Sequence, residues 1–238
     1  KASGGNSMNR TRMKKRMGLC LCLVFIPLTV LAGALLLEQN RYDIVMLLVA
    51  VLSIVPFFLR FEHKRQNVRE LVLVAVMTAL SVAGRFLFAP VPGFKPVTAI
   101  VIITGLYLGW EAGYLCGSLT ALVSNLYFGQ GPWTPFQMAI WGLIGLFAAL
   151  LAKQLCASRI LLCIYGVFSG VAYSAFMDVW STLWYDGYLN IARYLALLIT
   201  ALPFMAVYAV SNVVFLLMLT GPIGRKLTRI KTKYGLLQ

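Results

Sequence analysis

The sequence predicts an all-α integral membrane protein whose two termini both lie in the cytoplasm. Hydrophobic residues make up 61% of the chain and charged residues only 12%, compared with about 25% charged residues in soluble domains. The mean hydropathy is +0.84, and the apolar residues gather into long runs with short polar stretches between them. A soluble domain could not bury so much apolar surface, whereas a lipid bilayer solvates it.

Eight apolar runs are expected to form helices. They occupy residues 18–37, 43–60, 71–88, 97–109, 112–127, 137–152, 160–182 and 192–221. Only Trp110 and Glu111 separate the fourth run from the fifth, which predicts a tight helical hairpin. Proline interrupts the chain at 89–96 and again, with glycine, at 128–135, so both stretches are expected to be loops because proline cannot continue a helix.

The runs divide the chain into four parts. Residues 1–16 hold a stretch that resembles a cloning remnant, followed by a basic N-terminus. Residues 17–61 form a predicted extension of two transmembrane helices, and residues 68–225 form a predicted core of six helices. Residues 226–238 are expected to be a basic cytoplasmic tail.

The basic residues predict the orientation. If all eight runs span the bilayer, every one of the 21 lysines and arginines lies on one side except Arg41, Arg85, Lys95 and Arg193. Cytoplasmic loops carry the excess of basic residues, which places both termini inside. The net charge of +14 therefore reflects loops that face anionic lipid, and no nucleic acid partner is expected.

Several motifs are absent from the sequence. It contains no GxxxxGK[ST] phosphate loop, no HExxH metal motif and no GxSxG nucleophile elbow. Cys20 and Cys22 form a C-x-C pair without a nearby histidine, which is a weak metal signal. The chain is therefore expected to be neither an enzyme nor a metal-binding protein.

Polar and aromatic side chains gather at the helix ends away from the basic loops. Arg85 and Asp178 lie inside apolar runs, where a charge usually faces a cavity or a partner. Flat aromatic rings with a few polar groups are typical of a small-molecule pocket, although Trp and Tyr at the edges also form aromatic belts. The predicted binding residues are Arg85, Phe88, Phe94, Lys95, Asn125, Tyr127, Phe128, Gln130, Trp133, Gln137, Trp141, Tyr173, Asp178 and Trp184.

A stripe of small residues marks the first helix of the predicted core. Ala75, Ala79 and Ala83 follow each other at a spacing of four, so they share one helix face that another helix can approach closely. The partner helix could belong to this chain or to another protein.

Residues 68–225 resemble the substrate-binding S-components of energy-coupling factor (ECF) vitamin transporters. The resemblance is carried by the six-helix core, by the alanine stripe and by the run from Gly84 to Trp141. This run contains GRFLF, FKP and NLYFGQGPWTPFQM, and it is more similar to S-components of the cobalamin-type subgroup than to those for riboflavin or thiamin. The two N-terminal helices depart from the family's six-helix plan.

The resemblance implies a subunit of the prokaryotic plasma membrane that captures a vitamin from outside, with cobalamin favoured. Ala75, Ala79 and Ala83 would dock on a membrane coupling subunit, and two partner ATPases would hydrolyse ATP and drive the toppling that delivers the vitamin. The chain itself would hold no cofactor. The open alternatives are an S-component for a queuosine precursor or pantothenate, a membrane enzyme acting on lipids, and a structural subunit without a ligand.

The candidate residues then take expected roles. Aromatic rings would enclose the vitamin, and Arg85 and Lys95 could meet a phosphate or a carboxylate. Asn125, Gln137 and Asp178 would exchange hydrogen bonds with it. The loops at 89–96 and 128–135 are candidate gates.

Overall fold

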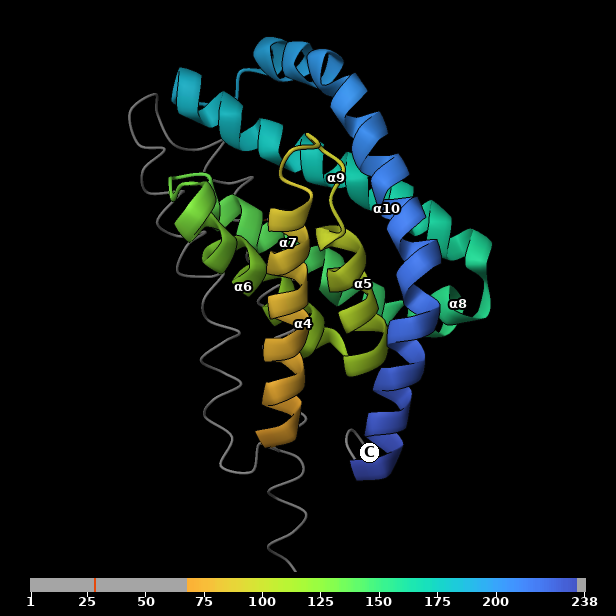
Figure 1. The fold of residues 1–238 in the computed structure, drawn as a ribbon. Coiled ribbons are helices and arrows are strands. Elements are labelled where there is room, and N and C mark those ends of the chain that lie inside the picture. Colours follow the sequence, from red (N-terminus) through yellow and green to blue (C-terminus); the bar gives the residue numbers. More distant parts are fainter. Residues whose placement is uncertain (1–27, 29–67, 235–238) are drawn as a thin grey trace, which may run out of the picture.

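The structure is a computed structural model that describes Leu28 and residues 68–234, and within this part every regular element is a helix (Figure 1). The predicted helices 18–37 and 43–60 lie outside the described residues except for Leu28. The same is true of the predicted N-terminus, residues 1–16, and of His63.

The six runs predicted between 71 and 221 each correspond to a helix. The helices are α4 (Val68–Leu87), α5 (Val97–Leu108), α6 (Trp110–Phe128), α7 (Thr134–Leu150), α8 (Ala152–Ala157), α9 (Arg159–Asp186) and α10 (Ile191–Tyr234). The short α8 had no counterpart among the predicted runs. The loops at 89–96 and 128–135 interrupt the helices where proline and glycine predicted, although α7 already begins at Thr134.

The last helix is longer than its apolar run. It continues past residue 221 to Tyr234, so most of the stretch predicted as a basic tail is helical. Figure 1 shows α10 bending sharply near its start. Pro203 lies inside this part of the helix, and a proline removes one backbone hydrogen bond and kinks the helix.

Three of the described helices, α4, α9 and α10, are long and apolar enough to cross a membrane, whereas α5 and α7 are shorter apolar helices. Helix α5 has 12 residues and therefore reaches only about 18 Å, short of the roughly 30 Å of a bilayer core. All of its residues except Tyr107 are buried. Its apolar character therefore reflects burial inside the protein more than contact with lipid.

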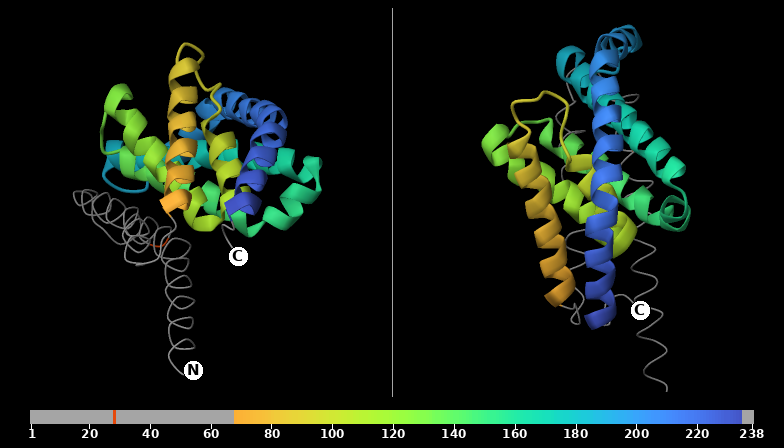
Figure 2. Two further views of the ribbon diagram at one scale, coloured as in Figure 1. Left: turned by 60° about the horizontal axis from the view of Figure 1, so that its bottom comes forward. Right: turned by 45° about the vertical axis from the view of Figure 1, so that its right-hand side comes forward.

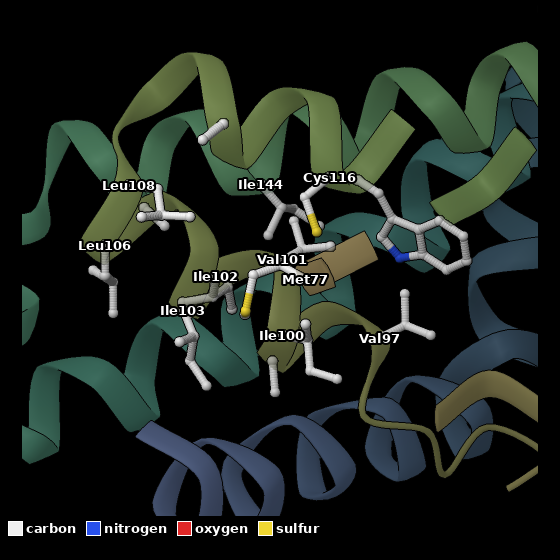
Figure 3. Close-up of a cluster of buried hydrophobic side chains, with 14 of the residues drawn as sticks. Met77, Val97, Ile100, Val101, Ile102, Ile103, Leu106, Leu108, Cys116 and Ile144 are labelled. Carbon is white, nitrogen blue, oxygen red and sulfur yellow. The ribbon is translucent and has the colours of Figure 1, made fainter. Parts of the chain in front are cut away.

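The buried core surrounds α5. Figure 3 shows Met77, Cys116 and Ile144, which come from α4, α6 and α7, close to Val101 of α5. All four side chains are at most 4% exposed. The central helix thus has neighbours on several sides, as a helix that is apolar all round requires.

Glycines allow α5, α6 and α7 to approach closely. A Cβ atom on Gly105 or on Gly113 would collide with the backbone of Gly145. The chain passes from α5 to α6 at Gly109, whose φ of +91° is a conformation that favours glycine. The predicted hairpin is therefore present, and its glycines also contact α7.

Contacts at one end of the molecule join the start of α4, the end of α5 and the end of α10. The Arg69 guanidinium lies 4.5 Å from the ring centre of Tyr234, and Lys231 Nζ donates a hydrogen bond to the Tyr107 carbonyl at 2.8 Å. Figure 2 shows the start of α4 and the end of α10 side by side. We call this the basic end, and the 88–96 loop lies at the opposite end (Figure 1).

Candidate ligand cavity

A cavity of about 160 Å³ lies beneath the 88–96 loop. It is lined by Arg85, Gly93, Lys95, Val97, Thr98, Gln137, Trp141, Gly170, Tyr173, Tyr208 and Asn212. These residues come from α4, the loop, α5, α7, α9 and α10. Five predicted binding residues, Arg85, Lys95, Gln137, Trp141 and Tyr173, are among them.

A buried hydrogen-bond network holds Arg85 in place. Its Nη1 donates to the Ser124 hydroxyl and to Asn125 Oδ1 at 2.8 Å. Asn125 Nδ2 in turn donates to Thr134 Oγ1 at 2.9 Å and to Gln137 Oε1 at 2.8 Å. Asn125 is only 1% exposed, so this amide links α4, α6 and α7 without contact with water. Both acceptors of the guanidinium are neutral.

A flat aromatic wall continues from this network. Gln137 Nε2 donates to the Tyr173 hydroxyl at 3.0 Å. The rings of Trp141 and Tyr173 stack with centroids 5.1 Å apart and an interplanar angle of 15°, and Tyr208 meets Tyr173 edge-on at 5.5 Å. The indole Nε1 of Trp141 is buried and has no hydrogen-bond partner. The wall therefore offers flat apolar surface to a planar ligand.

Two cations share the ring of Phe128. The Arg85 guanidinium lies 4.7 Å from its centre and Lys95 Nζ lies 5.4 Å from it, which are cation–π distances. The backbone of Lys95 is fixed by Ser211, which accepts from its N–H at 2.8 Å and donates to its carbonyl at 3.1 Å. Burial, and to a smaller extent Arg85, lowers the pKa of the Lys95 amine below its usual value.

Several predicted binding residues lie away from the cavity lining. Phe88 and Phe94 pack on Phe215 of α10, with ring centres 5.0 and 5.1 Å away, and so support the loop from inside. Tyr127 is 75% exposed and meets the edge of Phe86. In this structure the rings of Phe88 and Phe94 pack inside the protein, and the ring of Tyr127 lies on its surface.

The 128–135 loop uses its predicted residues to stabilise itself. The amide of Gln130 donates to the Leu122 carbonyl and accepts from the Thr134 hydroxyl. Trp133 lies edge-on to Trp180 at 5.8 Å. This loop is therefore tied to α6 and α9.

Two predicted residues of α9 also lie apart from the cavity. Trp184 stacks on Trp180 at 6.0 Å and is 43% exposed. Asp178 does not line the cavity, and its Oδ2 is buried without a hydrogen-bond partner in the described part of the chain.

Sequence reasoning missed the contribution of α10. Tyr208 and Asn212 line the cavity, and Asn212 Nδ2 donates to the Gly166 carbonyl at 3.0 Å. Gly170 also lines it and lies against the backbone of α10 at Ala209. The polar pair Ser211 and Asn212 within the apolar run 192–221 was the available signal.

A family model for the S-component of ECF-type riboflavin transporters matches residues 65–229. The chain belongs to this family. No curated protein and no solved structure gives a significant match. The family consists of membrane transporter subunits rather than enzymes, and the match includes every residue of the cavity lining. The resemblance to the cobalamin-type subgroup is not confirmed by the match.

In this S-component the alanine stripe is free on the surface of α4. Ala75, Ala79 and Ala83 are all exposed, whereas Met77 and Ser81 on the opposite face are at most 2% exposed. Within this chain, therefore, the stripe does not serve as a close packing surface for another described helix.

The described part of the S-component offers no cluster of candidate metal ligands. Residues 28 and 68–234 contain no group of three or more His, Cys, Asp or Glu side chains that could hold a metal ion. Cys20, Cys22 and His63 lie outside that part.

Proposed function

We propose that this S-component captures a vitamin in the cavity beneath the 88–96 loop and delivers it into the cell with the help of an ECF coupling subunit and two ATPases. The observation that carries the proposal is the cavity itself. The stacked pair Trp141 and Tyr173 lies there beside the buried network of Arg85. Such a combination of flat apolar walls and a few fixed polar groups is typical of small-molecule sites.

The size of the cavity favours a small planar vitamin over cobalamin. Pockets for drug-sized ligands usually measure about 300–1,000 Å³, and this one measures about 160 Å³. A corrin macrocycle would need a much wider space. Riboflavin, the vitamin named in the family's description, is closer in size, although the loop would have to open for it.

Cobalamin remains the second candidate because of the sequence run from Gly84 to Trp141. Its binding would require the loops at 89–96 and 128–135 to move apart. The hydrogen bonds of Lys95 to Ser211 hold the first loop to α10. Those of Gln130 hold the second loop. Both loops would therefore have to give up contacts that they make in this structure.

The exposed stripe of Ala75, Ala79 and Ala83 is the proposed docking face for the coupling subunit. Small side chains let two transmembrane helices approach closely, so that packing supplies the attraction. The cavity and the stripe use different faces of α4, because Arg85 is buried while the alanines are exposed. Capture and docking can therefore proceed on one helix without interference. No observation favours the alternative of a lipid-modifying enzyme.

The proposal is tested by direct binding. The full chain, purified into lipid nanodiscs, is titrated calorimetrically with riboflavin, cobalamin, thiamin, pantothenate and nicotinate. We expect saturable binding of one vitamin, and weaker binding in Trp141→Ala because the aromatic wall is lost. Trp184→Ala is the matched control, since this tryptophan lies away from the cavity. Absence of saturable binding for every vitamin would overturn the proposal.

A further inference from the structure

Two positive charges point to the chemistry of the ligand. Arg85 and Lys95 both line the cavity, and both lie over the ring of Phe128 at 4.7 and 5.4 Å. Arg85 is only 9% exposed. Two like charges near each other in a poorly hydrated space repel one another and lose hydration, so a site of this kind is stabilised when an anion enters.

No carboxylate of the described chain supplies that negative charge. The side-chain hydrogen bonds of Arg85 go to Ser124 and Asn125, which are neutral. An ion pair joins Arg193 in the first turn of α10 to Asp186 at the end of α9, with 2.7 Å between Nε and Oδ2. Asp178 does not line the cavity.

The remaining described carboxylates are distant from the two cations. Glu70 and Glu111 lie in the first turns of α4 and α6, at the basic end. Along α4 alone, the separation between Glu70 and Arg85 is about 22 Å. The cavity lining therefore contains two cations and no carboxylate from residues 68–234.

The indole N–H of Trp141 is a third hydrogen-bond donor, in addition to the side chains of Arg85 and Lys95. Trp141 lines the cavity, and its buried indole N–H has no hydrogen-bond partner among the described residues. An indole can only donate, as can a guanidinium and an ammonium. The ring of Trp141 stacks on Tyr173, and the Arg85 guanidinium lies 5.3 Å from the Trp141 ring centre, so the cation lies beside a flat aromatic wall.

We propose that the ligand is a planar ring compound with one anionic group, a carboxylate or a phosphate, bound between Arg85 and Lys95. The inference rests on the proposed function and narrows its substrate class, because neutral vitamins would leave both cations without a counter-ion. Charge-assisted hydrogen bonds to carboxylate or phosphate are stronger than neutral ones, and the ring would lie against Trp141 and Tyr173.

The test uses pairs of probes that share a ring system and differ in the presence of an anionic group. The full chain in nanodiscs is titrated with nicotinate and nicotinamide for the carboxylate, and with FMN and riboflavin for the phosphate. One anionic member should bind at least about tenfold more tightly than its neutral counterpart, as expected for the loss of a hydrogen bond to a charged group. The pair that shows the difference identifies the anion.

Variants assign the effect to the cavity. Lys95→Gln should weaken binding of the anionic probe by about tenfold and leave the neutral probe unchanged. This residue lies in the loop, so its replacement spares the buried network, whereas Arg85→Lys tests the guanidinium with the charge kept. Lys226→Gln removes the same charge from an exposed site at the basic end and should change neither affinity.

Two outcomes contradict the inference in different ways. If a neutral vitamin binds as tightly as its anionic counterpart, or if Lys95→Gln weakens both members equally, the anion is refuted while vitamin binding stands. If neither these probes nor cobalamin, thiamin or pantothenate binds, the proposed function fails and the inference fails with it.

Discussion

At the scale of single residues, Asn125 connects the candidate site. It accepts a hydrogen bond from Arg85 and donates to Thr134 and Gln137, and all of these groups are buried. Removal of the amide would take one hydrogen bond from each of these partners, and Gln137 Oε1 would lose its donor. A buried polar atom left without a partner costs more free energy than the lost bond itself contributes.

Asn125→Ala is therefore expected to lower the free energy of unfolding by about 1–3 kcal/mol and to weaken vitamin binding because Arg85 loses its position. Thermal unfolding in detergent and calorimetric titration measure the two effects. Gln154→Ala, which removes an exposed amide on α8, is the control and should change neither. Unaltered stability in Asn125→Ala would show that the network does not carry this role.

The amine of Lys95 is expected to make the affinity for an anionic ligand depend on pH. Burial and Arg85 lower the pKa of its amine, so it loses its proton at a lower pH than an ordinary lysine, whose pKa is about 10.4. A bound anion favours the charged form, hence binding takes up a proton and the affinity falls as the pH rises through the lowered pKa. Tyr173 and Tyr208 also line the cavity. A tyrosine in its neutral form adds no charge, so these two residues do not alter the charge of the site.

Titration of FMN or nicotinate across roughly pH 7–10 measures this dependence. We expect the affinity of the unmodified protein to decline towards the upper end, and that of Lys95→Gln to stay nearly constant. A decline of equal size in the variant would assign the titration to another group.

At the scale of helices, a glycine where two helices touch tolerates an added side chain less well than a glycine on an exposed helix face. Gly105 of α5 lies so close to Gly145 of α7 that an added Cβ would overlap backbone atoms. Gly221 of α10 has open space around the same position apart from its chain neighbour Pro222. The two glycines therefore provide a matched pair.

Gly105→Ala should destabilise the protein by about 1–3 kcal/mol because the helices must move apart. Gly221→Ala should change the stability by less than about 1 kcal/mol, because it displaces no other helix: alanine favours a helix more than glycine does, and its Cβ crowds only the ring of the following Pro222. The midpoint of thermal unfolding in detergent distinguishes the two. A stable Gly105→Ala would mean that α5 and α7 tolerate a wider spacing.

The exposed face of α4 gives a prediction about transport. Ala79→Trp places a bulky ring in the middle of the stripe, which should prevent the close approach of a coupling subunit and abolish vitamin uptake by cells. Binding to the purified protein should be unchanged because Ala79 is exposed while the cavity side of α4 is buried.

Ala196→Trp, at another exposed alanine on α10, controls for the bulk of the ring and should retain uptake. If Ala79→Trp lost binding as well, the assignment of the stripe to docking would be refuted. Co-purification with the coupling subunit and the two ATPases gives an independent measurement of docking.

At the scale of the whole molecule, the basic end and the cavity lie at opposite ends. The basic end gathers Arg69, Lys231 and Tyr107 around the end of α10, and the cavity lies beneath the 88–96 loop at the other end. From the positive-inside rule we propose that the basic end faces the cytoplasm and the cavity faces the outside.

Cysteine labelling tests this orientation. In a background with the five natural cysteines replaced by alanine, Tyr127→Cys at the exposed end of α6 that is remote from the basic end should react with a membrane-impermeant thiol reagent in intact cells. Lys226→Cys at the basic end should react only after the cells are permeabilised. The reverse pattern would contradict both the orientation and capture from outside.

The sequence by itself determined that the protein is a membrane protein. It also determined which stretches of the described core form helices and loops, and which residue types are available for a binding site. These properties depend on local composition and on proline and glycine, and they are therefore visible along the chain. It also indicated Arg85 and Lys95 as charges near an apolar zone. Boundaries were less certain, as the extension of α10 to Tyr234 shows, because a helix can continue through polar residues once its end is packed.

Only the tertiary structure decided which candidates meet. Arg85 contacts Asn125, 40 residues away, and Lys95 is fixed by Ser211, 116 residues away. Tyr208 lines the cavity and Asp178 does not. Which face of a helix points into the cavity depends on the helices that pack against it and not on its own sequence. The small volume of the cavity follows from that same packing, and no run of residues could have predicted it.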